Sequence, residues 1–134
     1  MKLDIGSGDK EHWFKPEEQG WIRLDCERYE GVTYWVCPDK LPVEDNSVSE
    51  VYIGQFLIET SPAEHRELAK ELIRVMKDDG IIRVHCYESI ATWKEFVKTL
   101  EKAGWIPFTE ELVNVYESDG DLIKTYISEI RRVR

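Results

Sequence analysis

A short apolar run that ends in Gly-Ser-Gly opens the chain (KLDIGSGDK, residues 2–10), and it constrains the fold more than any other stretch. Residues 2–5 are typical of a buried β-strand. Gly6 and Gly8 have no Cβ, so the backbone that follows this strand can approach a ligand closely. In open α/β sheets, ligands bind at the carboxyl ends of the strands. We therefore predict an α/β protein with a nucleotide-binding turn after its first strand.

The first half of the sequence is rich in strand signals and poor in helix signals. We predict strands at residues 21–25, 32–37 and 48–57, the last centred on 50–53, because β-branched and aromatic residues are frequent there. Residues 6–20 are polar and contain Gly and Pro, which predicts a long loop between the first two strands.

Helix signals follow in the second half. Ser61 and Glu64 form a capping box around Pro62, which predicts a helix start, and Gly80 is predicted to stop this helix. Residues 81–87 are predicted to form a strand. A second helix is predicted over residues 92–103, with Thr92 and Glu95 as its capping box and Gly104 after its end.

The chain ends in two alternating runs, at residues 111–117 and 122–133, which are joined by Ser-Asp-Gly-Asp. Asp-Gly between such runs is a strong hairpin signal. The complete order predicts an α/β fold with a Rossmann-like, mostly parallel, twisted sheet of about seven strands and a C-terminal antiparallel hairpin, with reduced helical content in the first half. We expect residues 1–134 to form one domain.

Composition argues against several classes of function. The 134 residues carry a formal net charge of −9, which disfavours nucleic acid as a partner because phosphate neutralisation needs clustered Lys and Arg. No apolar run approaches the roughly 20 residues that span a bilayer, and no signal peptide is recognisable, so we expect no membrane partner. Cys26, Cys37 and Cys86 form no CxxC pair, which suits a reducing, cytoplasmic compartment, and no metal-ligand spacing is recognisable.

Asp25 ends the predicted second strand, where an acid can accept hydrogen bonds from both ribose hydroxyls. A nicotinamide site normally has a third glycine, and Glu11 occupies that position here. A pyrophosphate would also sit poorly beside Asp4, Asp9 and Glu11, whereas a cationic cofactor with an amino group would sit well. The residues therefore favour S-adenosylmethionine over a nicotinamide dinucleotide, and a nicotinamide-dependent oxidoreductase is the disfavoured alternative.

Two later segments, LPVEDNSVSEVYIGQFLIE (residues 41–59) and LIRVMKDDGIIRVH (residues 72–85), add a family resemblance. Together with LDIGSG and GWIRLD, they resemble the class I S-adenosylmethionine-dependent methyltransferases, most closely the small type-11-like members. The resemblance covers residues 2–87, and the terminal hairpin is similar to the sixth and seventh strands of that family. The matching positions of the two later segments are Leu41, Pro42, Asp45, Asn46, Ser47, Arg74, Val75, Met76, Lys77 and Gly80.

The resemblance implies a cofactor site and a reaction. The cofactor would be S-adenosylmethionine and the product S-adenosylhomocysteine. Asp25 would hold the ribose hydroxyls and Cys26 would contact the adenine, while the turn after the first strand would line the ribose and the methionine end. The implied cofactor-binding residues are Asp4, Gly6, Ser7, Gly8, Asp25, Cys26, Cys37, Pro38, Gln55 and Phe56.

Three departures from the family pattern leave two functions open. Cys37 stands where an Asp often binds the adenine amino group, Leu57-Ile58-Glu59 replaces Leu-Glu-His, and the usual helices around the first strand are missing or reduced. The chain therefore resembles a methyltransferase reduced to its nucleotide-binding core. One function is methyl transfer to an unknown acceptor, either a small molecule or a substrate presented by a partner. The alternative is a non-catalytic binding or subunit domain with a degenerate cofactor site.

No catalytic residue can be assigned from the sequence, because methyl transfer mainly requires alignment of the acceptor with the cofactor methyl group. A base is needed only when the acceptor must lose a proton. Side chains that could act as a base are Gln55, Glu59, His85, Tyr87 and Glu88, although a structural role explains each of them more simply. An exposed sheet edge also leaves room for a homodimer.

Overall fold

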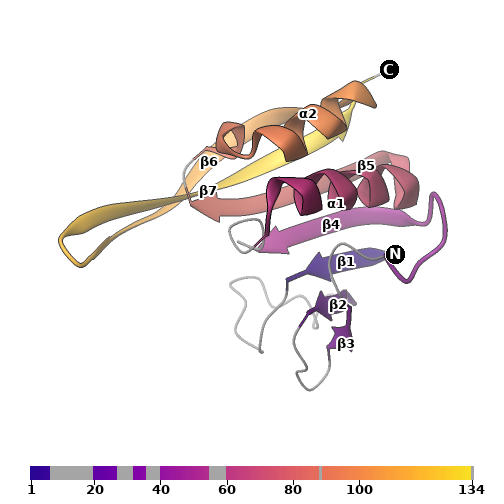
Figure 1. The fold of residues 1–134 in the computed structure, drawn as a ribbon, viewed down its shortest axis with the longest axis horizontal. Coiled ribbons are helices and arrows are strands. Elements are labelled where there is room, and N and C mark those ends of the chain that lie inside the picture. The colour runs from indigo at the N-terminus through magenta and orange to yellow at the C-terminus, as the bar shows by residue number, and fades with distance from the viewer. Residues whose placement is uncertain (7–19, 27–31, 36–39, 55–59, 88, 134) are drawn as a thin grey trace.

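Seven strands form one sheet in the order β3-β2-β1-β4-β5-β7-β6 in the computed structural model, which describes residues 1–6, 20–26, 32–35, 40–54, 60–87 and 89–133 (Figure 1). Strands β1 to β5 run parallel, and β7 runs antiparallel to both of its neighbours. The sheet thus has the doubly wound order 3-2-1-4-5-6 with β7 inserted before β6. The strands are β1 (Lys2–Ile5), β2 (Ile22–Asp25), β3 (Thr33–Tyr34), β4 (Val48–Gly54), β5 (Met76–Tyr87), β6 (Trp105–Ser118) and β7 (Asp121–Arg132).

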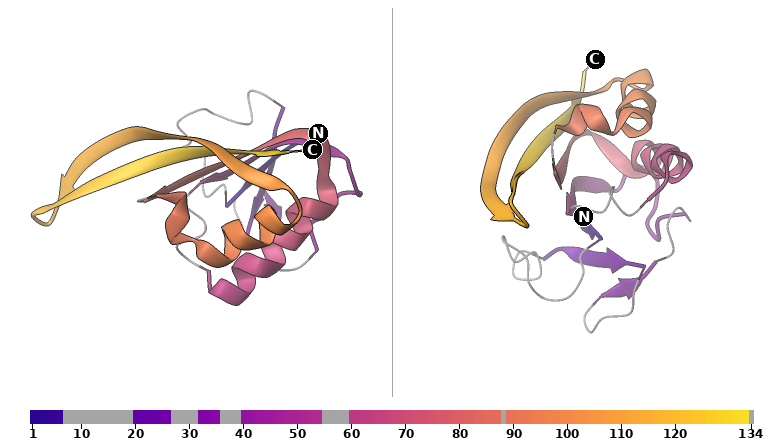
Figure 2. Two further views of the ribbon diagram at one scale, coloured as in Figure 1. Left: turned by 90° about the horizontal axis from the view of Figure 1, so that it is seen from above. Right: turned by 60° about the vertical axis from the view of Figure 1, so that its left-hand side comes forward.

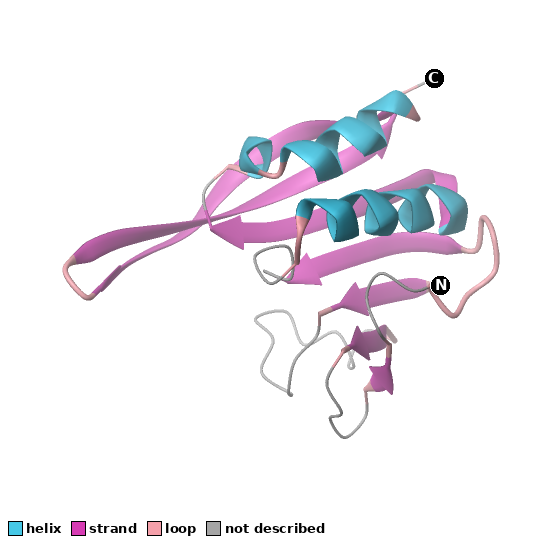
Figure 3. Cartoon of the chain, viewed as in Figure 1, coloured by secondary structure: helices cyan, strands magenta, loops and turns pink. Residues whose placement is uncertain are grey.

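Two helices, α1 (Pro62–Val75) and α2 (Lys94–Lys102), cover one face of this sheet, and a short 3-10 helix, η3 (Ile90–Thr92), precedes α2 (Figures 2 and 3). Helix α1 connects the parallel strands β4 and β5, and such a crossover places a helix on a sheet face. The predicted α/β class, the strand number and the antiparallel terminal hairpin are confirmed. No helix in the described ranges is long and apolar enough to cross a membrane.

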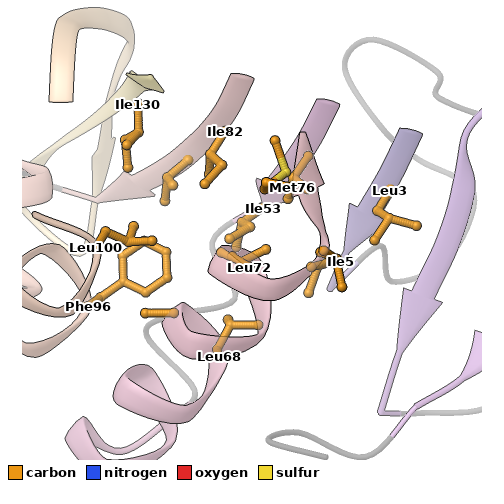
Figure 4. Close-up of a cluster of buried hydrophobic side chains, with 14 of the residues drawn as sticks. Leu3, Ile5, Ile53, Leu68, Leu72, Met76, Ile82, Phe96, Leu100 and Ile130 are labelled. Atoms are coloured by element: carbon orange, nitrogen blue, oxygen red, sulfur yellow. The ribbon is translucent and has the colours of Figure 1, made fainter. Parts of the chain in front are cut away.

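The hydrophobic core lies between the two helices and the sheet (Figure 4). Alternate residues of β1, β4 and β5 point toward the helices, as the two-residue period of a strand requires. The helices contribute residues at helical spacing, among them Leu68 and Leu72 from α1 and Phe96 and Leu100 from α2, all at most 1% exposed. The strand residues that they cover include Leu3, Ile5, Val51, Ile53, Ile82, Val84 and Ile130.

The start of α1 is confirmed, but its predicted end is wrong. Ser61 accepts a hydrogen bond from the backbone N–H of Glu64, and the Glu64 side chain accepts one from the N–H of Ser61. The helix ends at Val75 and the chain continues directly into β5. Gly80 does not have the left-handed conformation of a helix stop. Its missing side chain instead permits close packing, because a Cβ there would lie 2.5 Å from Cε of Met76.

The predicted start of the second helix is also wrong. Ser89 caps η3 through the backbone N–H of Ala91, and Trp93 separates η3 from α2 without a side-chain cap. Glu95 contacts Arg66 of α1 at 3.5 Å instead of completing a capping box with Thr92. Glu95 therefore belongs to an exposed ion pair between the two helices and not to a capping box.

The strand boundaries differ from prediction at both edges of the sheet. Strand β3 covers Thr33–Tyr34, within the predicted 32–37, and residues 36–37 lie outside the described ranges. The terminal hairpin is longer than predicted, because β6 begins at Trp105. Its Asp-Gly turn is confirmed: Asp119 and Gly120 both have positive φ, at 51° and 83°, as a two-residue hairpin turn requires.

Candidate functional site

The carboxyl ends of β1 and β2 lie side by side and present the two best-supported elements of the candidate site. Gly6 directly follows β1 with φ of 70°, a conformation that favours glycine. Its N–H donates a hydrogen bond to the Leu24 carbonyl at 2.8 Å, which fixes the turn against β2. Asp25 is the last residue of β2 and is 7% exposed, and Cys26 follows it in an exposed position. A left-handed glycine and a buried acid thus meet at one edge of the sheet.

Strand β4 ends at the same edge (Figure 1). Ile5 of β1 pairs with Ile53 of β4, and Gly54 pairs with His85 of β5, so these strands end close together. The structure therefore brings together the ends of β1, β2 and β4, as the sequence predicted. Ser7, Gly8, Cys37, Pro38, Gln55 and Phe56 lie outside the described residues, and their assignment to the cofactor site stays a prediction.

Asp4 does not lie in the turn itself. It is fully buried on the sheet face opposite the helices, and its carboxylate oxygen lies 4.0 Å from Nε of Arg23, which is also buried. The register pairs Asp4 with Arg23 on one side and with Tyr52 on the other. A buried charge is tolerated when an opposite charge is near, so Asp4 and Arg23 stabilise each other behind the turn at Gly6.

Tyr52 and His85 form a polar pair on the same face. The Tyr52 hydroxyl lies 3.1 Å from Nδ1 of His85, and Tyr52 is 2% exposed. Burial lowers the pKa of His85 below its ordinary value, which favours the neutral imidazole. Gly54 makes room for this pair, because a Cβ there would lie 3.0 Å from Cε1 of Tyr52. Alternation along β4 and β5 was the sequence signal for this pair, but the sequence analysis considered only His85 and assigned no role to Tyr52.

A cavity of about 250 Å³ opens between the start of α1 and the start of α2. His65, 4% exposed, packs edge-on against Trp93 with ring centroids 5.6 Å apart. Both helices start at the edge where β4 and β5 end, so the cavity lies at the carboxyl edge of the sheet (Figure 1). Its lining includes Thr60, Pro62, His65, Trp93, Lys94 and Glu95. Sequence reasoning gave no indication of this cavity.

The first part of the segment 41–59 that resembles the family, residues 41–47, lies at the opposite edge of the sheet. The last turn of α1 organises it, because the carbonyls of Arg74 and Val75 accept hydrogen bonds from the N–H groups of Asn46 and Ser47. Arg74 also donates to carbonyl and carboxylate oxygens of this segment, including the Leu41 carbonyl at 3.0 Å and Asp45 at 2.8 Å. The matching residues of this segment therefore stabilise the fold and lie away from the candidate site.

Among the residues with described positions, no group of three or more His, Cys, Asp or Glu side chains is arranged to hold a metal ion.

Comparisons with known proteins give the fold but no sequence family. No protein-family model matches the sequence, and no curated protein matches it. A SAM-dependent methyltransferase from Methanosarcina mazei superposes with a TM-score of 0.74 at 13% identity, over 98% of this chain and 92% of that one.

Two further solved structures are similar. A Burkholderia thailandensis 1,6-didemethyltoxoflavin-N1-methyltransferase, crystallised with its substrate and S-adenosylhomocysteine, gives a TM-score of 0.69 at 15% identity, over 97% of this chain and 70% of that one. A precorrin-6y C5,15-methyltransferase from Geobacter metallireducens gives a TM-score of 0.66 at 18% identity, over 98% of this chain and 79% of that one. The chain therefore has the Rossmann-like fold of the class I S-adenosylmethionine-dependent methyltransferases.

Proposed function

We propose that residues 1–134 form one methyltransferase domain that binds S-adenosylmethionine at the carboxyl edge of the sheet and methylates an acceptor. The observation that carries the proposal is the juxtaposition of Gly6, in a left-handed conformation after β1, with buried Asp25 at the end of β2. A glycine turn admits a ligand close to the backbone, and an acid in this place accepts hydrogen bonds from a ribose.

The described residues fit this cofactor. Asp25 would hold the ribose hydroxyls, the turn at Gly6 would admit the ribose and the methionine end, and Cys26 would contact the adenine. The net charge of −9 adds a favourable field for a cationic sulfonium. When bound, the cofactor supplies an activated methyl group that passes from sulfur to the acceptor nucleophile and leaves S-adenosylhomocysteine. The chain would bind and align both molecules.

We infer that the acceptor is a small molecule that binds in the cavity beside His65 and Trp93. A cavity of about 150 Å³ is known to hold benzene, so 250 Å³ is large enough for a substituted ring. Trp93 offers an apolar wall, and the buried side chain of His65 adds a polar group to the lining. The methyltransferase from Burkholderia thailandensis, whose name specifies a heterocyclic substrate, is a precedent for such an acceptor on this fold.

Binding of the product tests the cofactor site. Asp25→Asn removes the charge at nearly constant volume, and we expect it to weaken S-adenosylhomocysteine binding at least tenfold, which is about 1.4 kcal/mol. Asp79→Asn is the matched control, because Asp79 is exposed and lies near the amino end of β5. Equal affinity of both variants, with native circular dichroism spectra, would show that Asp25 does not bind the cofactor.

Turnover separates the enzyme from a non-catalytic binding domain. We expect release of S-adenosylhomocysteine when the protein is incubated with S-adenosylmethionine and a panel of small hydroxylated and nitrogen-containing rings. Trp93→Leu should raise KM for an active ring compound while leaving the affinity for S-adenosylhomocysteine unchanged. Cofactor binding without turnover on any acceptor would support the non-catalytic alternative.

A further inference from the structure

Trp93 gives the cavity between α1 and α2 a fixed aromatic wall. The two helices run side by side on the sheet (Figures 1 and 2), and Arg66 of α1 lies 3.5 Å from Glu95 of α2. The indole of Trp93 is partly buried, packs against the hydrophobic core and meets the ring of His65 edge-on. Because the wall is already in place, a flat ring can pack on it at a low ordering cost.

Lys94 adds a positive charge to the lining of the same cavity. It follows Trp93 directly, begins α2 and is exposed. Among the described residues, no carboxylate forms an ion pair with its ammonium group. A lysine ammonium is a compact point charge that binds carboxylate and phosphate groups, so Lys94 can contact an anionic group of a ligand.

The acidic side chains near this lysine already have partners. Glu95 is the only carboxylate among the described residues that line the cavity, and it pairs with Arg66. Glu64, in the first turn of α1, accepts a hydrogen bond from the backbone N–H of Ser61 at 3.2 Å. The positive charge of Lys94 is therefore the charge that a ligand can compensate.

The charge of the whole chain requires such an anion to be held by a local contact. Acidic residues outnumber lysines and arginines by 27 to 18, which gives the formal net charge of −9. This charge opposes the approach of anions at long range. A carboxylate carries one negative charge and matches the single lysine, whereas a phosphate monoester carries about −1.5 to −2 at pH 7 and would be opposed more strongly.

We propose that the acceptor is an aromatic or heteroaromatic ring that carries a carboxylate, with the ring on Trp93 and the carboxylate at Lys94. The adjacency of these two residues suits both contacts, because the apolar stem of a lysine covers hydrophobic surface while its charged head stays in water. The buried imidazole of His65 offers a hydrogen-bonding group to a hydroxyl or ring nitrogen of the ligand. This inference rests on the proposed function, because it names the class of acceptor for the same cavity.

Saturation-transfer NMR titrations of the full chain with 4-hydroxybenzoate, and with its uncharged counterpart 4-hydroxybenzamide, test the proposal. We expect the wild-type chain to bind 4-hydroxybenzoate about threefold more tightly, which is the order of effect that an exposed ion pair produces. The preference should decrease at high salt, because the contact is exposed to solvent.

Two variants locate the preference. Lys94→Gln should abolish it by weakening the binding of 4-hydroxybenzoate, while the affinity for 4-hydroxybenzamide stays nearly unchanged. Lys98→Gln is the matched control and should retain the preference, because Lys98 is an exposed lysine one turn further along α2 that does not line the cavity. Both positions are exposed, and circular dichroism verifies that each variant is folded.

Several results would overturn the proposal. One is equal affinity of the wild-type chain for the two probes, and another is the absence of detectable binding of 4-hydroxybenzoate at millimolar concentration. A preference that persists in Lys94→Gln, or that is lost equally in Lys98→Gln, would show that the cavity lysine does not cause it. Titration of the same samples with S-adenosylhomocysteine separates the two levels of inference. Failure of the proposed function removes that binding, whereas failure of the acceptor class alone leaves it intact.

Discussion

Arg74 holds together the end of α1 and the segment before β4, and its removal should destabilise the fold without affecting the candidate site. Its guanidinium makes five hydrogen bonds: two to Glu71, one to Asp45, and one each to the carbonyls of Leu41 and Val43. Glu71 completes the network by accepting the N–H of Leu41 at 2.6 Å. Arg74 thus donates to the backbone carbonyls of Leu41 and Val43, and no other described side chain is shown to donate to either of them.

The structure gives the size of the effect. The Asp45 side chain is 70% exposed, so its ion pair contributes at most about 1 kcal/mol. The Glu71 side chain is 17% exposed and Leu41 is 1% exposed, and hydrogen bonds between a charged donor and such groups contribute about 1.5–3 kcal/mol. Because water partly replaces the lost partners, we expect Arg74→Met to lower the free energy of unfolding by about 3 kcal/mol.

Urea unfolding at pH 7 measures this change, and thermal unfolding should show a decrease of roughly 10 °C in Tm. Lys70→Met is the control on the same helix, because Lys70 forms an exposed ion pair with Glu67 and its loss should change stability by less than about 0.5 kcal/mol. Arg74→Met should bind S-adenosylhomocysteine as wild type does, because Arg74 lies at the far edge of the sheet. A loss of stability no greater than that of Lys70→Met would refute the reasoning.

Three further predictions follow from burial and packing. Burial raises the pKa of the Cys86 thiol to about 11, so Cys86 should resist alkylation at pH 8 while the exposed Cys26 reacts. S-adenosylhomocysteine should slow the reaction of Cys26. Peptide mapping that finds Cys86 labelled before Cys26 would contradict this prediction. Gly80→Ala should lower the free energy of unfolding by about 1–3 kcal/mol, because its Cβ would lie 3.0 Å from the backbone oxygens of Ser49 and Lys77 and would displace the end of the buried Met76 side chain. A neutral effect in urea unfolding would show that the packing there is loose. Burial lowers the pKa of His85 below its value of 6.5 in the unfolded chain, so the unfolded state binds the proton more readily. The free energy of unfolding should therefore fall as the pH drops below 6.5, and His85→Gln should show a smaller fall between pH 7 and pH 5. An equal fall in the variant would show that burial of His85 is not the cause.

Local signals in the sequence predicted most of the fold. The capping box at Ser61 and the Asp-Gly turn at Gly120 are short-range features whose geometry depends on a few neighbouring residues, and both are present. The end of α1 could not be predicted in the same way. It depends on Asn46 and Ser47, which lie about thirty residues earlier in the sequence. Their N–H groups donate hydrogen bonds to the last two carbonyls of the helix.

The candidate site was predictable in part for the same reason. Gly6 and Asp25 follow from strand ends and turn chemistry, which the sequence displays directly. The Tyr52–His85 pair and the cavity beside His65 arise from register and helix packing between segments far apart in the chain. Segment 41–47 was read as a sign of the cofactor fold, and its contacts show a structural role at the opposite edge.

Calorimetric titration of the folded protein with S-adenosylmethionine, and separately with S-adenosylhomocysteine, tests the central claim most directly. The cradle formed by Gly6 and Asp25 predicts one site per chain that binds both ligands with micromolar dissociation constants. The absence of binding heat for both ligands at several temperatures, in a protein with a native circular dichroism spectrum, would contradict the claim and show that this fold is present without its cofactor site.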